Sequence, residues 1–270
     1  MDIKRENVYR RFNFKKYIYP MGSALALVAT WQVSIYIFSI PPYLLPGPYL
    51  IIKELFSNSH LLWGHAWVTI YETFLGLGLA VIVAIPISVV VVWSKPIEKT
   101  VVPIMVFFQT IPKVAIAPLI MIWFGYGYYS IIFISFLLAY FPIAIQMIAG
   151  LQDVEPELLN LVKSMSATPL QSFIKIRIPN SLPYFFSGLK LGVLLAWSGA
   201  IMGEFMGSMK GLGFLVIYAG ERSNTKLVFA DLVILLVLGK VYFSLVEWIE
   251  QYVISWHTVG REREKVSYAT

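Results

Sequence analysis

The sequence predicts an all-α, polytopic membrane protein with six transmembrane helices. Of its 270 residues 58% are hydrophobic and only 13% are charged, about half the charged fraction of an average soluble domain. The apolar residues also fall into runs of about 20, the length that a helix needs to cross a hydrocarbon core of about 30 Å. In chain order, the six expected spans are residues 18–39, 66–92, 101–123, 129–149, 183–207 and 228–253.

The composition excludes several classes of protein and of site. The chain contains no cysteine, which excludes disulfides, iron–sulfur clusters and thiolate zinc sites, and we expect no catalytic residue, metal or other cofactor. His60, His65 and His257 are scattered and do not form the His-Glu-x-x-His site of a metalloprotease. The sequence also lacks Gly-x-x-x-x-Gly-Lys-[Ser/Thr], so the chain does not bind ATP through a P-loop.

The distribution of basic residues predicts the orientation of the chain in the plasma (cytoplasmic) membrane. With the N-terminus inside, fourteen Lys and Arg residues fall in inner segments and four in outer segments. Inner segments carry the excess of Lys and Arg in membrane proteins, so we expect both termini in the cytoplasm. The net charge of +6 therefore indicates a lipid bilayer as the partner and not nucleic acid. The expected domains are a basic cytoplasmic N-terminus (1–17), a single transmembrane domain (18–256) and a cytoplasmic tail (257–270).

The first span follows a basic leader, which is also the pattern of a signal peptide. The Ala-Leu-Ala triplet at residues 24–26 imitates a cleavage site, but apolar sequence continues beyond it to Ile40. A cleavage site belongs at the end of the apolar run, so we expect an uncleaved first span. After this span, Leu-Pro-Gly-Pro at residues 45–48 predicts a turn, and residues 49–56 predict a short amphipathic outer segment.

Two prolines interrupt the third span. Pro112 and Pro118 are expected to divide it into two half-helices, because proline lacks the N–H group that a helix interior needs. Backbone groups freed in this way are tolerated at membrane depth only where they face protein or a water-filled cavity. The break and its neighbours Gln109 and Lys113 are therefore candidates for a pathway through the membrane.

A hydrophilic loop at residues 151–179 separates the fourth and fifth spans, and its sequence predicts two short helices. Pro156 suits the first turn of the first helix, which we expect to end near Ser166 and Ala167. Thr168 predicts the cap of the second helix, since Pro169 follows it and Gln171 completes a capping box. We expect Ile178 and Pro179 to end the second helix, and Pro183 to mark the entry into the fifth span.

Several polar and small residues within the spans are candidate functional or packing positions. Glu204 is expected near the outer end of the fifth span, where a gate and a structurally satisfied carboxylate are equally good interpretations. Lys190 and Glu247 either pair or reach the interface separately, and we favour separate positions. The regular spacing of Gly199, Gly203 and Gly207 predicts a closely packed face, within the chain or between two copies.

The 151–179 loop resembles the EAA loop of binding-protein-dependent ABC importer permeases. That pattern has Glu-Ala-Ala, a glycine about four residues on, and a proline about a dozen residues beyond. This chain has Asn160-Leu161-Val162, Ser166 and Pro179, so the proline matches and the other positions are replaced.

Other motifs are similar to the nitrate/sulfonate/taurine branch of that family and cover about residues 44–256. They are Leu-Pro-Gly-Pro (45–48), Gln-Thr-Ile-Pro-Lys-Val-Ala-Ile-Ala-Pro-Leu (109–119), Trp-Phe-Gly-Tyr-Gly (123–127), Ile-Pro-Asn-Ser-Leu-Pro (178–183), Gly-Glu-Phe (203–205) and Gly-Leu-Gly (211–213). The Ile-Pro-Lys and Gly-Glu-Phe variants look most similar to members for pyrimidine- or riboflavin-type precursors.

The resemblance implies a type I ABC importer permease that forms the translocation pathway for a small solute and is not itself an enzyme. Its implied partners are two copies of a cytoplasmic ATP-binding subunit, an extracytoplasmic substrate-binding protein and a second permease subunit, which we expect to be an identical copy. The implied ATPase-docking residues are Glu157, Asn160, Lys163, Ser166, Ala167, Thr168, Pro169 and Pro179. The candidate pathway or gate residues are Gln109, Pro112, Lys113, Pro118, Tyr140, Phe141, Gln146, Trp197 and Glu204.

Alternatives exist for the substrate and for the class of protein. A permease for sulfonate, taurine or nitrate is the alternative within the family, although an ionised Glu204 at the outer mouth would repel an anion. An ion-coupled secondary transporter would need coupling residues near the midplane, often with inverted repeats, and neither is evident. An intramembrane enzyme lacks a recognisable catalytic site in this sequence.

Overall fold

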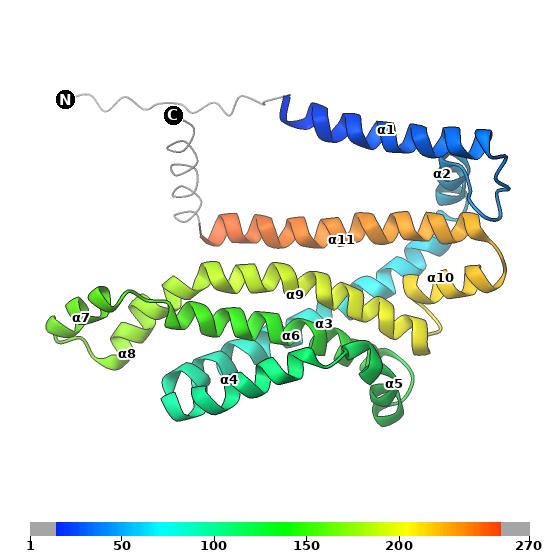
Figure 1. Ribbon diagram of the computed structural model, residues 1–270. Coiled ribbons are helices and arrows are strands. Elements are labelled where there is room, and N and C mark those ends of the chain that lie inside the picture. Colours follow the sequence, from blue (N-terminus) through cyan, green and yellow to red (C-terminus); the bar gives the residue numbers. More distant parts are fainter. Residues whose placement is uncertain (1–14, 255–270) are drawn as a thin grey trace.

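The computed structural model describes residues 15–254, and all regular structure in this range is helical (Figure 1). The predicted tail 257–270 and most of the predicted N-terminal segment lie outside the described residues. The elements are α1 (Lys15–Ile37), α2 (Pro48–Ser57), α3 (Ser59–Trp93), α4 (Lys95–Thr110), α5 (Lys113–Phe124), α6 (Tyr128–Gln152), α7 (Pro156–Ser164), α8 (Pro169–Ser172), the π-helical turn η1 (Phe173–Arg177), α9 (Ile178–Gly207), α10 (Leu212–Glu221) and α11 (Thr225–Val253).

Four of the described helices are long and apolar enough to cross a membrane. They are α3, α6, α11 and the continuous helix Pro169–Gly207, which joins α8, η1 and α9. The pair α4 and α5 meets the same test only when taken together, with a bend of 95° between its members, and counts as a fifth span if the two helices are taken as one. The apolar part of α1, Met21–Ile37, is shorter, so the first of the six predicted spans stays a prediction.

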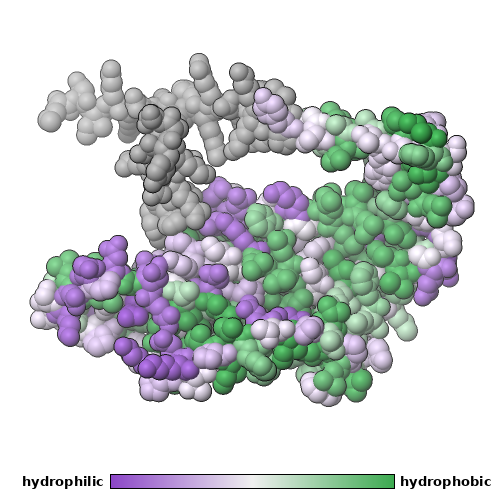
Figure 2. All heavy atoms as spheres, viewed as in Figure 1, coloured by the Kyte–Doolittle hydropathy of each residue, from purple (hydrophilic) through white to green (hydrophobic). Residues whose placement is uncertain are grey.

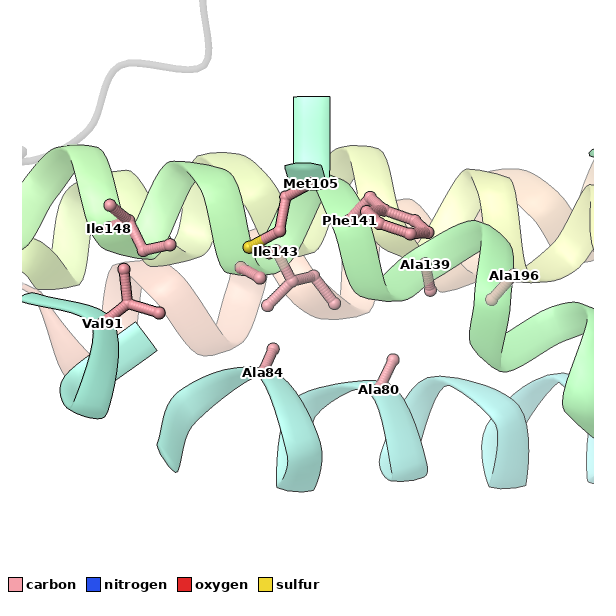
Figure 3. Packing of buried hydrophobic residues seen from close by; sticks show 10 residues of the cluster. Ala80, Ala84, Val91, Met105, Ala139, Phe141, Ile143, Ile148 and Ala196 are labelled. Atoms are coloured by element: carbon pink, nitrogen blue, oxygen red, sulfur yellow. The ribbon is translucent and has the colours of Figure 1, made fainter. Parts of the chain in front are cut away.

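Helices α3, α6 and α9 form the centre of the bundle (Figure 1). Their shared apolar cluster is built largely from small side chains, among them Ala80, Ala84, Ala139 and Ala196, with Ile143 filling the space between helices (Figure 3). Small residues let helix backbones approach closely, and in a membrane this close packing replaces the hydrophobic driving force that water supplies. The small residues of the sequence therefore favour close packing of α3, α6 and α9 at the centre of the bundle.

The glycines of α9 pack within this chain, which answers a question that the sequence left open. A side chain at Gly192 would come within 2.8 Å of Ile143, and one at Gly188 within 2.9 Å of the Gln146 Cβ. Gly199 approaches the Ser135 backbone in the same way, and the Ser135 hydroxyl donates a hydrogen bond to the Ala196 carbonyl. The glycine stripe therefore fixes the contact between α9 and α6.

The two ends of the bundle differ in character. Figure 2 shows hydrophilic residues gathered at the α7–α8 end, while hydrophobic residues cover much of the surface over the rest of the bundle. The other end carries the short helices α2 and α10, and α2 corresponds to the predicted outer segment 49–56. Ile51 of α2 and Leu215 of α10 share one apolar cluster with Leu62 of α3 and Leu227 of α11. Both short helices are thus packed against the spans.

Candidate coupling loop and translocation pathway

The first helix of the loop forms where the sequence predicts it, over Pro156–Ser164. Pro156 lies in the first turn, and Glu157 lies at the positive end of the helix dipole. Lys163 lies in the last turn, where its charge complements the negative end. Asn160 is exposed on the same helix, so the candidate docking residues of α7 all belong to one surface element.

The turn after α7 explains the position of Ser166. The N–H groups of Ser166 and Ala167 donate to the carbonyls of Lys163 (3.0 Å) and Val162 (3.2 Å), the pattern of a Schellman cap. Ser166 has φ of 59°, the left-handed conformation that favours glycine. The EAA pattern has glycine at this place, and Ser166 adopts the conformation that glycine favours.

The second helix begins with the predicted capping box. The Thr168 N–H donates to the Gln171 side-chain oxygen (2.9 Å), and the Gln171 N–H donates to the Thr168 hydroxyl (3.2 Å). Pro169 follows in the first turn, as predicted. The end of α7 and the start of α8 are therefore both fixed by hydrogen bonds between residues close in sequence.

The predicted end of the second helix is wrong. The helix does not stop at Ile178 and Pro179 but continues through η1 into α9, and Pro183 lies inside α9 and not at its start. The Ile178 N–H bonds to the Phe173 carbonyl, five residues back. This wider turn lies directly before Pro179, which occupies the first turn of α9, where its missing N–H is tolerated.

The loop exposes apolar side chains that nothing in the described chain covers. Leu161 is 57% exposed, Met165 73% and Leu170 56%, and neither α7 nor α8 has a buried residue. Exposed apolar patches with polar surroundings occur at protein–protein and membrane interaction sites. The loop is thus a projecting, capped element with an uncovered apolar face.

The third span is broken at Ile111 and Pro112, between α4 and α5. The predicted break is confirmed at the first proline, whereas Pro118 lies inside α5. The Lys113 ammonium donates to the Gln109 carbonyl at the end of α4 (3.0 Å) and lies 5.7 Å from the centre of the Phe141 ring of α6. Lys113 thus satisfies a carbonyl that the break leaves free, at the negative end of the α4 dipole.

Aromatic rings line α6 beside the break. Successive ring centres along Phe124, Phe133, Phe136, Tyr140 and Phe141 lie 5.0, 5.6, 5.7 and 5.2 Å apart, so the ladder runs from α5 along α6. Sequence reasoning found only the last two rings. The helical spacing of Phe133, Phe136 and Tyr140 is the signal that would have found the two further rings of α6, whereas Phe124 belongs to α5 and has no such signal.

The other candidate pathway residues lie apart from the break. Gln146 lies on α6 more than one helical turn after Phe141, and it faces Gly188 of α9. Trp197 is buried and packs against Tyr242 of α11, with ring centres 5.4 Å apart. The structure therefore brings Gln109, Lys113, Tyr140 and Phe141 together and leaves Trp197 on the far side of α9.

Glu204 caps the helix α10. Its side chain is 1% exposed, and one carboxylate oxygen accepts the Gly213 N–H (2.6 Å). Two side chains of α3 hold the neighbouring amides: Thr69 accepts the Leu212 N–H (2.8 Å), and His65 accepts the Gly211 N–H (3.0 Å). The first turn of α10 is therefore held by side chains from two spans, and Glu204 is positioned as its anchor.

Two further acidic residues surround this anchor, and sequence reasoning did not connect them with it. Glu72 of α3 and Asp231 of α11 both interact electrostatically with Glu204, although no hydrogen bond joins either carboxyl group to it. Both are fully buried. No group of three His, Asp or Glu residues within 15–254 is arranged to hold a metal ion. Three buried acidic side chains, one each from α3, α9 and α11, therefore lie together, and Glu204 alone of the three bonds to α10.

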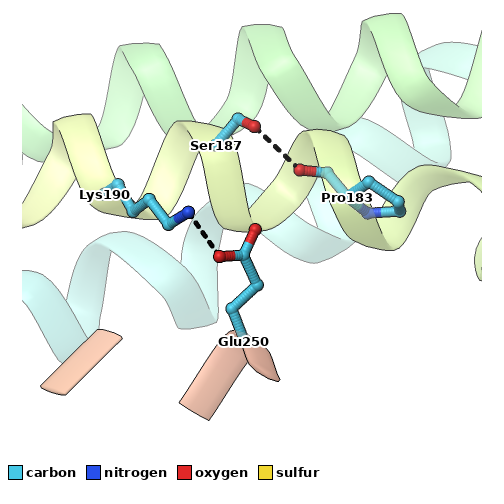
Figure 4. Close-up of polar contacts among 4 residues, drawn as sticks. All are labelled: Pro183, Ser187, Lys190 and Glu250. Carbon is cyan, nitrogen blue, oxygen red and sulfur yellow. Dashed lines mark hydrogen bonds and ion pairs between the residues drawn. The ribbon is translucent and has the colours of Figure 1, made fainter. Parts of the chain in front are cut away.

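Lys190 pairs with Glu250, which corrects the predicted arrangement. The sequence favoured separate positions for Lys190 and Glu247, but the Lys190 ammonium forms an ion pair with Glu250, one helical turn beyond Glu247 (Figure 4). Both side chains are mostly buried between α9 and α11, where two separate charges would be costly. Lys240, for which the sequence offered no partner, lies 5.3 Å from the centre of the Phe243 ring.

Most of the chain is similar to known transport permeases. Residues 76–255 match the model of the family described as "Binding-protein-dependent transport system inner membrane component". A Haemophilus influenzae protein named "Probable ABC transporter permease protein" is 38% identical over 85% of this chain and 94% of its own length. The formylaminopyrimidine transport permease protein ThiX of Halalkalibacterium halodurans is 33% identical over 86% of this chain and 93% of its own length.

A solved structure shares the fold. A chain of the methionine ABC transporter MetNI, in an inward-facing conformation, superposes with a TM-score of 0.64 at 22% identity, over 73% of this chain and 98% of that chain. The family match covers more than half of the sequence and agrees with the helical bundle and its broken span. This chain therefore belongs to the family of binding-protein-dependent transport system inner membrane components: it is a multi-pass inner membrane permease subunit of an ABC importer, and ATP is hydrolysed by a partner subunit.

Proposed function

We propose that two copies of this chain form the translocation pathway of an importer for a flat heterocyclic solute of the pyrimidine or riboflavin type. In this proposal residues 18–256 are the permease domain, both termini are cytoplasmic, and an extracytoplasmic binding protein delivers the solute at the α10 end. The fourteen-to-four bias of Lys and Arg toward the inner segments supports the orientation. It assigns the α7–α8 end to the cytoplasm.

The observation that carries the proposal is the exposed apolar face of the two loop helices. Leu161, Met165 and Leu170 project from helices that no other part of the described chain covers. We assign residues 156–171 as the docking element for the ATP-binding subunit, one element for each of two ATPase copies. A capped helix seated on a partner carries that partner's closure into the bundle as a rigid-body motion.

The substrate class follows from the aromatic ladder beside the broken span. Phe133, Phe136 and Tyr140 are half-buried, so part of each ring is left for a flat heterocycle to stack on. Relatives named for formylaminopyrimidine and for riboflavin support this class, and they are 33% and 30% identical to this chain.

A second substrate class is favoured by Lys113. Its cationic side chain lies at the break and would attract a sulfonate or nitrate, and relatives named for aliphatic sulfonates and taurine occur at 30% and 26% identity. The expected repulsion by Glu204 loses its basis, because that carboxylate is buried against α10 and does not line a surface. The charges near the pathway do not decide between the two substrate classes, so a transport assay is needed to distinguish them.

The docking assignment is tested at Ser166. Ser166→Arg places a long charged side chain in the exposed turn between the two loop helices, and we expect it to abolish co-purification of the ATP-binding subunit. Ser166→Gly is the matched control, because glycine suits the left-handed turn and should leave the complex intact. Undiminished co-purification with Ser166→Arg would contradict the docking assignment.

The substrate class is tested by uptake into proteoliposomes that contain the whole complex. We expect aromatic heterocycles such as aminopyrimidines to be imported or to compete, and Phe136→Leu to weaken this by removing one stacking face. Import of a sulfonate or nitrate with no competition from heterocycles would overturn the first class and establish the second.

A further inference from the structure

The base of the 151–179 loop is closed by side chains that reach from its end back to its beginning. A helix leaves its last four carbonyl groups without partners inside the helix. At the end of α6 two of these, on Gly150 and Leu151, accept hydrogen bonds from residues of η1 and α9. The partners lie 26 and 30 residues further along the chain, so these bonds join the two ends of the loop.

Arg177 and Asn180 make this closure. One guanidinium nitrogen of Arg177 donates to the Leu151 carbonyl (3.1 Å), and its charge lies at the negative end of the α6 dipole. The Asn180 amide donates to the carbonyls of Gly150 (3.1 Å) and Asp153 (2.6 Å). We call Arg177 and Asn180 the loop clamp.

The helices are packed tightly around the clamp. The Tyr184 hydroxyl donates to the Asp153 carboxylate, so a second side chain of α9 holds the same link. A side chain at Gly150 would come within 2.6 Å of the Tyr184 Cβ, which shows how closely α6 and α9 approach here. The clamp therefore joins the backbones of α6 and α9 where the two helices are close together.

The loop has two places where it could pivot without the clamp. One is the non-helical link at residues 153–155, between α6 and α7, and the other is the π turn before α9. Neither α7 nor α8 has a buried residue, and the buried side chains at the base are Val154 and Phe173. Force applied to α7 and α8 must therefore pass through the base of the loop.

We infer that Arg177 and Asn180 are positioning residues that hold the two loop helices rigid against α6 and α9, so that movement of the docked ATPase becomes movement of the spans. The inference rests on the proposed docking element at residues 156–171. Arg177 and Asn180 are not assigned to docking itself. Without the clamp the ATPase would still bind, but α7 and α8 would tilt at the two pivots. Part of the ATPase movement would then not reach the spans.

The test uses the complete complex with Arg177→Met and Asn180→Leu, singly and together. Both replacements keep the approximate size of the side chain and remove its hydrogen-bond donors. Ser187→Ala is the matched control, since the Ser187 hydroxyl donates to the Pro183 carbonyl of its own helix (2.9 Å) and does not reach α6 (Figure 4). The readouts are ATPase co-purification, ATP hydrolysis, uptake and the ATP consumed for each solute imported.

We expect the double variant to retain the ATPase and to hydrolyse ATP, while uptake falls about tenfold, within the range of about 5–150-fold typical of coupling between sites. Arg177→Lys should restore part of the coupling, because lysine keeps a cationic donor toward Leu151. Ser187→Ala should transport like the wild type.

Two results would overturn the inference. An unchanged ratio of ATP to imported solute in the double variant would show that the clamp carries no motion. Loss of ATPase co-purification in Arg177→Met or Asn180→Leu would assign these residues to docking, which leaves the proposed docking element intact. Failure of the docking element itself is read separately, from Ser166→Arg.

Discussion

Among the glycines of residues 15–254, Gly211 has the least room for a side chain. Its φ is 106°, a conformation that favours glycine, and a Cβ there would lie 2.2 Å from the Glu204 carboxyl group. The glycine therefore allows Glu204, Thr69 and His65 to reach the first amides of α10. This contact accounts for the joint presence of Gly-Glu-Phe at 203–205 and Gly-Leu-Gly at 211–213.

We predict that Gly211→Ala destabilises the protein by at least about 1–3 kcal/mol, the cost of a strained backbone conformation, before the steric contact is added. Gly220→Ala in the same helix is the control, because nothing lies within 4 Å of a Cβ at Gly220 and alanine favours a helix. Thermal unfolding of the purified complex measures both. Equal midpoints for Gly211→Ala and wild type would contradict the described docking of α10.

The Lys190–Glu250 pair shows what sequence reasoning could not resolve at the residue scale. Glu247 and Glu250 are one helical turn apart on α11, so the sequence alone does not show which of them faces α9. Which glutamate pairs with Lys190 depends on how α9 and α11 are rotated and shifted against each other. Hydrophobic periodicity does not determine that register.

We predict that Glu250→Gln lowers stability by about 1–3 kcal/mol, because it leaves the Lys190 charge mostly buried and unpaired. Glu247→Gln should change stability by less than about 0.5 kcal/mol, as expected for a side chain outside such a pair. Denaturation monitored in detergent compares the two variants. A larger effect of Glu247→Gln would support the alternative pairing.

At the scale of elements, prolines were the least reliable guide. Pro112 breaks the third span because Ile111 and Pro112 both leave helical geometry, while Pro118 lies inside α5. Pro179 and Pro183 likewise lie within α9, although both were expected at helix ends. A proline removes one donor and fixes one dihedral angle, and a π turn or a first-turn position accommodates both effects.

We predict that the α4–α5 break lines a cavity that small polar reagents reach. In this chain, which has no native cysteine, single cysteines at Gln109 and Ala115 should react and be protected by substrate. Ala117 is fully buried two residues along α5, so a cysteine there should stay unreactive. Equal inertness of all three positions in every transport state would mean that the break is packed against protein and not open to the pathway.

For the whole molecule, the apolar runs were sufficient to predict the bundle. The expected second, fourth and sixth spans lie within α3, α6 and α11, because about 20 apolar residues can be satisfied in a membrane only as a helix. The starts of the two loop helices were predicted equally well, since capping boxes and first-turn prolines are local signals. The α10 anchor and the loop clamp were missed, because each joins residues far apart in the sequence.

Binding of the ATP-binding subunit at the α7–α8 end is the feature on which the proposed function depends most. The direct measurement places a photo-reactive amino acid at Leu161, on the exposed face of α7, and at Met209, which is 88% exposed at the opposite end. In membranes that contain the assembled complex, we predict adducts with the ATP-binding subunit from Leu161 and none from Met209. Absence of the Leu161 adduct, or an ATPase adduct from Met209, would contradict the account.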